Sequence, residues 1–168
     1  MNLDLLIDLH APNHRQGPGS DQDTFRALSF TDLPADRTLE VADLGCGTGA
    51  STLVLARALN ANIKAADLFA EFTDRLAHRA VEAQVKDKID IANHSMDDLP
   101  YEHESLDMIW SEGAIYNIGS ERGILPTIVP YRKHVGQLNR VPNISVPLGL
   151  IRKLTNSRKA SRPTGGCV

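Results

Sequence analysis

The sequence predicts an α/β protein built on a doubly wound parallel sheet. Short apolar segments alternate with helical segments through the first two thirds of the chain. This alternation implies right-handed crossovers between parallel strands, with helices on both faces of the sheet. A polar or glycine-rich loop follows each expected strand, and sheets of this class bind ligands beyond the carboxyl ends of their strands. The sequence therefore predicts a ligand site at that edge.

Four strands are expected, and each is a short apolar run that ends at a polar residue or a glycine. They cover Leu39–Leu44, 63–66, 89–92 and 106–110. Helical periodicity predicts helices at 50–59 and 69–83. The loops that follow the four strands are 45–49, Asp67, 95–97 and 111–113.

The N-terminal part precedes the first strand and carries one helix signal. Residues 3–9 fit a helix or a strand equally well, because the segment is short. Ser20, with Asp23 three positions later, indicates the start of a helix. Phe25 and Leu28 are expected to face the core from that helix.

The overall composition is that of a globular domain, with 168 residues, of which 42% are hydrophobic and 23% charged. No apolar run approaches the length of about 18 residues that crosses a bilayer, and the N-terminus lacks the positive charge of a signal peptide. Cys46 and Cys167 have neither a disulfide-framework nor a zinc-site spacing. We therefore expect a cytoplasmic protein with no metal site and no membrane partner.

The glycine-rich loop at 45–49 is suited to close approach by a ligand. Its three glycines allow a sharp turn without side chains in the way. Asp67 follows at the end of the next strand, where a carboxylate would hold a ribose diol. The pattern Gly45-x-Gly47-x-x-Ala50 also fits a dinucleotide, so a nicotinamide-dependent oxidoreductase is an alternative.

Asp43 distinguishes the two cofactor classes. A carboxylate two residues before the first glycine opposes a pyrophosphate, whereas it attracts an ammonium group. S-adenosyl-L-methionine carries an ammonium, a ribose diol and a positive sulfonium, and it has no phosphate. The residues around the loop therefore favour this cofactor.

These residues also carry a family resemblance. Residues 41–49, Val-Ala-Asp-Leu-Gly-Cys-Gly-Thr-Gly, resemble the first motif of class I S-adenosylmethionine-dependent methyltransferases, and Asp67 matches their acid after the second strand. Residues 95–100 resemble their adenine-side motif, while 111–119 and 16–20 resemble segments of a small-molecule subgroup. The resemblance implies a Rossmann-like sheet, an incomplete form of the seven-stranded fold of the family, and methyl transfer to a small-molecule acceptor.

The resemblance also implies which residues contact the cofactor. These are Asp43, Gly45, Cys46, Gly47, Gly49, Asp67, Leu68, Met96, Asp97 and Glu112. The glycines would shape the turn beneath the methionyl part, with Asp43 near its ammonium. Asp67 would hold the ribose hydroxyls, and Leu68 and Met96 would pack against the adenine. Asp97 would accept a hydrogen bond from the exocyclic amine.

The catalytic residue is unknown, because methyl transfer from a sulfonium depends chiefly on holding donor and acceptor in line. The candidates on the substrate side are His14, Glu112 and Tyr116; Glu112 would also lie near the methionyl or sulfonium end. Each has a structural alternative, such as a solvated loop for His14 and core packing for Tyr116. Cys46 is interpreted as a small loop residue, and Arg79 as part of a solvated charged face.

The domain organisation is expected to have three parts: cap helices at 1–36, a cofactor-binding half at 37–122 and a basic segment at 123–168. Residues 1–122 hold all 21 acidic and 10 basic residues, a net charge of −11, whereas 123–168 hold eight basic residues and no acid. Prolines interrupt this last segment, and we expect neither the family's fifth strand nor its Gly-Gly turn there. The segment is thus predicted not to be the family's C-terminal half, as a shifted reading frame or a truncated gene product would give.

The basic segment, taken as it stands, supports an alternative function. Eight basic residues without an acid are typical of a nucleic-acid-binding extension or a nucleic-acid methyltransferase. The segment has one tyrosine and neither phenylalanine nor tryptophan, so it nearly lacks the aromatic platforms on which bases stack. This composition argues against a nucleic-acid partner.

Overall fold

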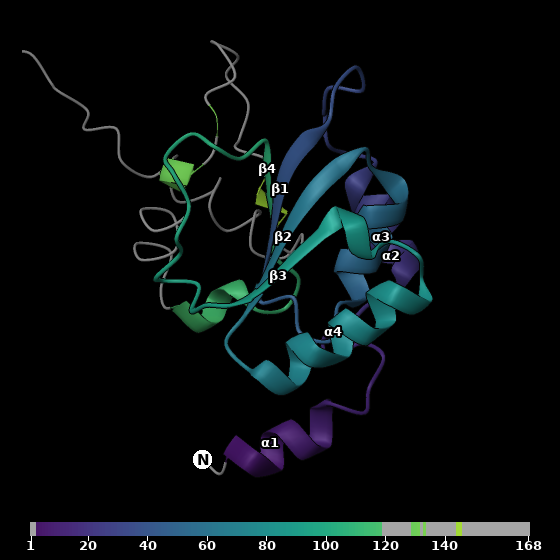
Figure 1. The fold of residues 1–168 in the computed structure, drawn as a ribbon, viewed down its shortest axis with the longest axis vertical. Helices are drawn as coiled ribbons and strands as arrows, with labels where there is room; N and C mark the ends of the chain where they lie inside the picture. The colour runs from purple at the N-terminus through teal and green to yellow at the C-terminus, as the bar shows by residue number, and fades with distance from the viewer. Residues whose placement is uncertain (1–2, 119–128, 132, 134–143, 146–168) are drawn as a thin grey trace, which may run out of the picture.

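A parallel sheet lies at the centre of the fold (Figure 1). The computed structural model describes residues 3–118, 129–131, 133 and 144–145. The strands are β1 (Leu39–Leu44), β2 (Ala61–Asp67), β3 (Ile89–Asn93), β4 (Met108–Trp110) and β5 (Ile144–Ser145). Their order is β3-β2-β1-β4-β5, and every neighbouring pair is parallel. The α/β class and the parallel sheet are therefore confirmed.

The strand order reverses beside β1. From β1 the chain moves outward to β2 and β3 on one side, and then returns to place β4 on the other side. Asp43 pairs with Ala65 of β2 and with Trp110 of β4, so the ends of three strands meet there. Ligands of open α/β sheets bind at such a switch point.

Helices cover one face of the sheet. They are α1 (Leu3–His10), α2 (Asp21–Leu28), α3 (Ala50–Ala58) and α4 (Ala70–Glu82). Figure 1 shows α2, α3 and α4 along the same face, while α1 lies apart from the sheet. No helix in the described part of the chain is long and apolar enough to cross a membrane.

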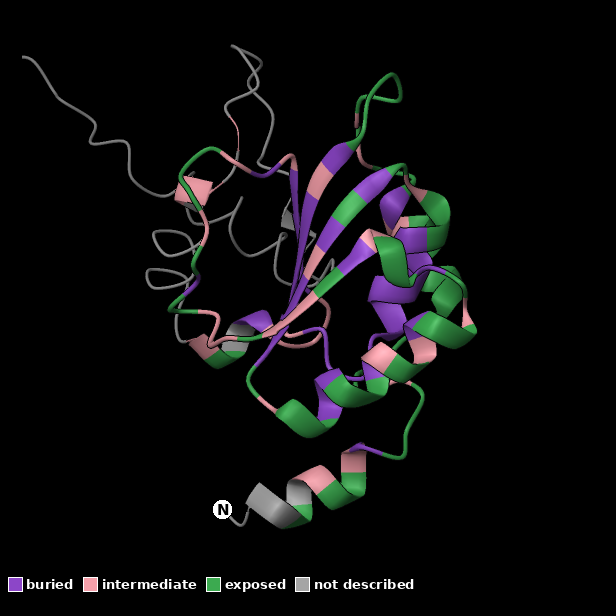
Figure 2. Ribbon diagram, viewed as in Figure 1, coloured by how far each residue is buried: buried purple, intermediate pink, exposed green. Residues whose placement is uncertain are grey.

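Two apolar clusters lie on opposite faces of the sheet, and Figure 2 shows their buried positions along β1 to β4. Val41 packs with Leu55 of α3 and Leu76 of α4 in the first cluster. Ala42 packs with Ile115 in the second cluster. Ile115 begins the short 3-10 helix η2 (Ile115–Ile118). The second face is thus covered by loops and 3-10 turns in the described residues, and the α-helices expected on both faces are found on one.

The N-terminal elements confirm one expectation and correct another. Ser20 and Asp23 form a capping box, in which the Asp23 N–H donates to Ser20 Oγ at 3.2 Å and the Ser20 N–H donates to Asp23 Oδ2 at 2.9 Å. On α2, Thr24 and Leu28 are buried, whereas Phe25 is 59% exposed. The prediction for Phe25 is wrong: Thr24 and Leu28, four residues apart, define the buried face, and Phe25 lies about 100° around the helix from Thr24, at the edge of that face.

Residues beyond 122 contribute to the fold at two places. Leu106 N–H donates to Tyr131 O, and Lys133 N–H donates to Leu106 O, both at 2.8 Å. The two-residue strand β5 pairs with β4. The expectation of no fifth strand is therefore wrong, because two residues are too few for an alternating pattern to signal a strand. Apart from 129–131, 133 and 144–145, residues 123–168 lie outside the described residues, as does the proposed break after 122.

Candidate cofactor site

The loop at 45–49 is tied to the neighbouring strand ends. Gly45 N–H and Cys46 N–H donate to Ala66 O at the end of β2, at 2.8 and 3.1 Å. Ser111 Oγ, after β4, donates to Leu44 O at 2.7 Å. The loops that follow β1, β2 and β4 therefore lie together at one edge of the sheet, as predicted.

Two glycines of the loop face close neighbours on the ligand edge. Gly45 and Gly47 have φ of +68° and +54°, which L-residues with side chains rarely adopt. A Cβ on Gly45 would stand 2.2 Å from Ala114 Cβ, and one on Gly47 would stand 1.9 Å from Gln16 Oε1. Neither position has room for a side chain. Residues 16 and 114 thus lie directly over the loop.

Gly49 serves a different contact from the other two glycines. It stands at the N-cap position of α3, with φ of +84°. A Cβ there would lie 2.1 Å from Leu76 Cδ1, a core residue of α4. The missing side chain at Gly49 therefore allows α4 to pack against the start of α3.

Asp43 is fully buried at the end of β1. Its Oδ2 accepts hydrogen bonds from Ser51 Oγ at 3.0 Å and from Thr52 Oγ1 at 2.7 Å. Its Oδ1 has no hydrogen-bond partner among the residues that the structure describes. Burial, with a smaller contribution from the nearby charges of Glu112 and Asp67, raises the pKa of this carboxyl to about 6, although the hydrogen bonds from Thr52 and Ser51 lower it. The site therefore contains a buried acceptor oxygen in an acidic environment.

Asp67 ends β2, with both carboxylate oxygens directed at backbone donors. Oδ2 accepts from the Gly47 N–H at 2.8 Å, and Oδ1 accepts from the Phe69 N–H at 3.1 Å. Burial raises the pKa of Asp67. The adjacent Leu68 is 62% exposed. The acid thus braces the glycine loop, and beside it an apolar side chain is open to solvent.

The turn after β3 places two predicted contacts differently. Met96 is partly buried, with its Sδ 3.5 Å from the Cβ position of Gly45, so it borders the glycine loop. Asp97 is exposed and accepts a hydrogen bond from Ser95 Oγ.

Cys46 is buried, and burial raises the pKa of its thiol well above the usual range. The Cys46 side chain is thus a protonated core group.

Glu112 follows β4 and is tied to the N-terminal segment. Its Oε2 accepts from Arg15 Nη1 at 2.6 Å and from Thr24 Oγ1 at 3.0 Å. Arg15 also donates to Asp21 at 2.9 Å. Neither Arg15 nor Gln16 is among the predicted contacts. Gln16 belongs to the segment 16–20 that resembles the small-molecule subgroup, whereas no local signal indicates Arg15, which contacts a residue 97 positions away.

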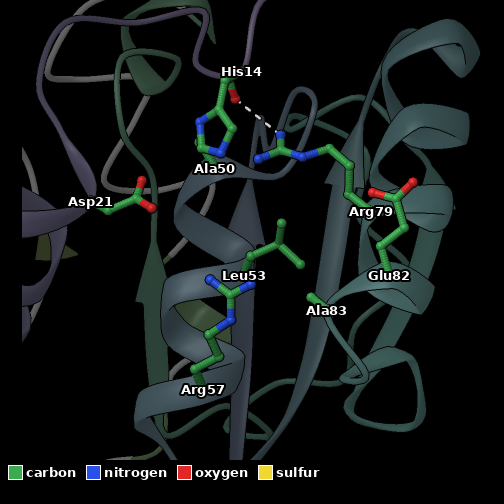
Figure 3. A pocket seen from close by; sticks show the side chains of 8 residues that line it. All are labelled: His14, Asp21, Ala50, Leu53, Arg57, Arg79, Glu82 and Ala83. Atoms are coloured by element: carbon green, nitrogen blue, oxygen red, sulfur yellow. Dashed lines mark hydrogen bonds between the residues drawn. The ribbon is translucent and has the colours of Figure 1, made fainter.

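His14 lies on the helical side of the molecule, at a cavity of about 260 Å³ (Figure 3). Its carbonyl oxygen accepts a hydrogen bond from Arg79 Nη1 at 3.0 Å, and the same nitrogen donates to Thr48 O. Arg79 therefore holds the N-terminal segment against the glycine loop, and its interpretation as a solvated residue is wrong. Tyr116 lies in η2, and its side chain is outside the described part of the structure.

A Rossmann-like sheet with a glycine loop at its switch point defines the class of fold. The chain belongs to the methyltransferase domain family, whose model matches residues 41–128. It is 29% identical over 126 residues to dimethylglycine N-methyltransferase of Parasynechococcus marenigrum, an alignment that covers 74% of this chain and 45% of that protein. It is 28% identical over 86 residues to sarcosine/dimethylglycine N-methyltransferase of Aphanothece halophytica, an alignment that covers 51% of this chain and 31% of that protein.

The likeness to solved structures concerns the fold. Geranyl diphosphate C-methyltransferase from Streptomyces coelicolor, solved with S-adenosyl-L-homocysteine, superposes with a TM-score of 0.59 at 18% identity. The superposition covers 67% of this chain and 41% of that chain. The chain thus spans less than half the length of the curated relatives described above. Family membership and fold are shown for the matched part.

Proposed function

We propose that this chain binds S-adenosyl-L-methionine at the carboxyl edge of β1 and β2 and serves methyl transfer to a small-molecule acceptor. One observation carries the proposal. Asp43 is a buried carboxylate whose Oδ1 has no partner in the described residues, and it lies under a loop whose glycines leave no room for side chains. A buried acceptor oxygen of this kind is stabilised by a cationic donor.

The charges around the loop support a cationic ligand over a pyrophosphate. Glu112 and Asp67 both act electrostatically on Asp43, so three carboxyl groups lie within interaction range of the loop. Of these three carboxyl groups, Arg15 pairs with that of Glu112. A pyrophosphate would meet repulsion here, which weighs against the nicotinamide-dependent alternative. The ammonium and sulfonium of S-adenosyl-L-methionine would be attracted.

The placement of the residues supports the individual contacts that we propose. Asp43 Oδ1 would accept from the ammonium, and Asp67 would exchange part of its backbone bonding for the ribose hydroxyls. Leu68, exposed beside Asp67, offers an apolar surface to the adenine. Met96, at Gly45, would border the same ring. Asp97 is exposed and open to the exocyclic amine.

In methyl transfer the main role of the protein is to position the donor and the acceptor. The cofactor supplies an activated methyl group, and the chain holds donor and acceptor in line. Glu112 Oε2 is engaged by Arg15 and Thr24. We therefore assign Glu112 to holding the N-terminal segment in place, while His14 and Tyr116 stay candidates on the acceptor side.

The acceptor is proposed to be a small N-methylated amino acid, because the relatives are named for dimethylglycine and sarcosine. The nucleic-acid alternative depends on 123–168, most of which lies outside the described residues. No observation at the described site favours it over a small-molecule acceptor.

Calorimetry separates the cofactor classes. The whole chain is titrated in parallel with S-adenosyl-L-methionine, S-adenosyl-L-homocysteine and NAD⁺. We expect the first two to bind and NAD⁺ to give no heat of binding. A second assay follows transfer of a labelled methyl group to sarcosine and dimethylglycine. Binding of NAD⁺ alone, or of none of the three ligands, would refute the proposal.

A further inference from the structure

Gln16 holds its side-chain amide over the glycine loop. Its Oε1 accepts a hydrogen bond from the Thr48 N–H at 3.1 Å and lies against Gly47. A backbone N–H can only donate, so the amide atom facing Thr48 is oxygen and Nε2 points elsewhere. Nε2 is buried and has no hydrogen-bond partner in the described ranges of the chain. A buried donor without an acceptor is unfavourable.

The segment around Gln16 is anchored at several points, so the position of its amide is set by the fold. Arg15 Nη1 pairs with Glu112 at 2.6 Å, and its Nη2 donates to Thr24 Oγ1 at 3.1 Å. Thr48 Oγ1 donates to the carbonyl oxygen of Asn13 at 3.1 Å. The amide of Gln16 is therefore presented to the loop by a fixed backbone.

Two unpartnered polar atoms of opposite character thus border the same loop. Gln16 Nε2 is a donor without an acceptor, and Asp43 Oδ1 is an acceptor without a donor. An α-amino acid end carries the complementary pair, because its carboxylate accepts hydrogen bonds and its ammonium donates them. Gln16 lies against this loop at Gly47, and Asp43 precedes the loop by two residues.

We propose that Gln16 Nε2 binds the carboxylate of the methionyl end of S-adenosyl-L-methionine, so that Gln16 and Asp43 together recognise its zwitterionic end. This inference rests on the proposed function. The group that Nε2 would bind is a carboxylate. An N-methylated amino acid acceptor also carries a carboxylate. The experiment therefore tests the cofactor and the acceptor separately.

The test compares S-adenosyl-L-methionine with its decarboxylated form, titrated calorimetrically into the whole chain and into Gln16→Glu. The variant keeps an acceptor oxygen for Thr48 and places a negative charge where the ligand carboxylate would bind. Gln22→Glu is the matched control, because Gln22 is exposed on α2. Thermal unfolding checks that each variant is folded. Should Gln16→Glu not fold, Gln16→Met is compared with the same two ligands.

We expect the unaltered chain to bind S-adenosyl-L-methionine about ten- to hundred-fold tighter than the decarboxylated form, as for a hydrogen bond to a charged group. Gln16→Glu should remove that preference. Its affinity for the decarboxylated ligand should stay within about three-fold of that of the unaltered chain. Gln22→Glu should retain the preference. Binding of dimethylglycine to the chain saturated with S-adenosyl-L-homocysteine should be the same for Gln16→Glu and the unaltered protein.

Three outcomes overturn the inference in distinguishable ways. If the unaltered chain binds neither ligand, the proposed function fails and the inference fails with it. If the chain binds both ligands equally, or if Gln16→Glu weakens both alike, the cofactor site stands and the role of Gln16 is refuted. If only dimethylglycine binding weakens in Gln16→Glu, the carboxylate read by Gln16 belongs to the acceptor and not to the cofactor.

Discussion

The guanidinium of Arg15 lies 2.6 Å from the carboxylate of Glu112, and this ion pair joins the N-terminal segment to the segment that follows β4. The two side chains are 13% and 24% exposed, so the pair is largely withdrawn from water. Thr24, fully buried on α2, donates to the same Glu112 oxygen. The contact closes the N-terminal part of the chain over the carboxyl edge of the sheet.

Arg15→Leu should lower the free energy of unfolding by about 2–3 kcal/mol, because it leaves Glu112 partly buried without its cation. Urea unfolding at pH 7 measures the change. Arg26→Leu, at an exposed position on α2, is the matched control and should cost less than about 0.5 kcal/mol. The double variant Arg15→Leu, Glu112→Leu should recover part of the loss; a double variant less stable than Arg15→Leu would contradict the assignment.

Asp43→Asn should stabilise the protein at neutral pH. The pKa of buried Asp43 is raised to about 6, so the cost of its charge grows as the pH rises from about 4, where the unfolded chain ionises, to about 6, and is constant above that. Below about pH 4 the group is protonated in both folded and unfolded chains, and its cost vanishes. We expect the variant to be about 1–3 kcal/mol more stable at pH 7.5 and the difference to narrow toward pH 4.

Urea unfolding of Asp43→Asn at pH 4.5, 6 and 7.5 measures this effect. Asp74→Asn, at an exposed position on α4, is the control and should show no such trend. A stability difference that does not change with pH would show that the buried carboxyl is not responsible.

Gly49→Ala should cost about 2–4 kcal/mol of stability, which combines the strain of a positive φ with a collision against Leu76. Gly19→Ala separates the two causes. Gly19 has φ of +106°, but a Cβ added there would lie 3.8 Å from its nearest neighbour, Asp23 Oδ2, which is an ordinary contact distance. The Gly19 variant should therefore cost only about 1–2 kcal/mol. Equal costs in urea unfolding would mean that the contact between α3 and α4 at this point is not tight.

Asp107 connects the segment just before β1 to the segment beyond residue 122. Its carboxylate accepts from both terminal nitrogens of Arg37, at 2.6 and 2.9 Å, and from Lys133 Nζ at 3.1 Å. The Arg37 hydrogen bonds hold the pKa of Asp107 well below its usual range. The resulting stabilisation is present above about pH 4 and is lost as the pH falls further.

Asp107→Asn should therefore cost about 2 kcal/mol at pH 7, with a smaller loss in acid. Lys133→Met should cost less, about 0.5–1 kcal/mol, since its pair with Asp107 is partly exposed. Chemical unfolding of both variants is compared with that of Lys86→Met, at an exposed position in the 3-10 helix η1 (Lys86–Lys88). If Lys133→Met has no more effect than Lys86→Met, the pair of Lys133 with Asp107 does not contribute to stability.

The strands could be predicted where an apolar run ends at a glycine or an acid. The bounds of β1 match the prediction because four of the six residues of Leu39–Leu44 are apolar and Gly45 ends the strand. β2 begins two residues earlier than expected, at Ala61, because pairing with Leu39 draws it into the sheet despite the polar Asn62. The two-residue β5 depends entirely on pairing with β4 and has no pattern of its own.

The site was predictable in so far as its residues follow strands directly. Asp43 and Asp67 stand at strand ends, where the fold class alone locates ligand contacts. Gln16 and Arg79 reach the glycine loop from segments 32 and 31 residues away, and only the packed structure brings them there. The resemblance of residues 16–20 marks the segment of Gln16 but not its contact with the loop, and no periodicity or motif marks Arg79.

The most direct measurement compares binding of S-adenosyl-L-methionine to the unaltered chain and to Asp43→Asn by calorimetry at pH 7.5. It tests whether the buried carboxylate at the end of β1 recognises a cationic cofactor. We expect the unaltered chain to bind, and Asp43→Asn, although at least as stable, to bind about ten-fold or more weakly. Equal affinity in the two proteins, or binding of NAD⁺ in place of S-adenosyl-L-methionine, would contradict this claim.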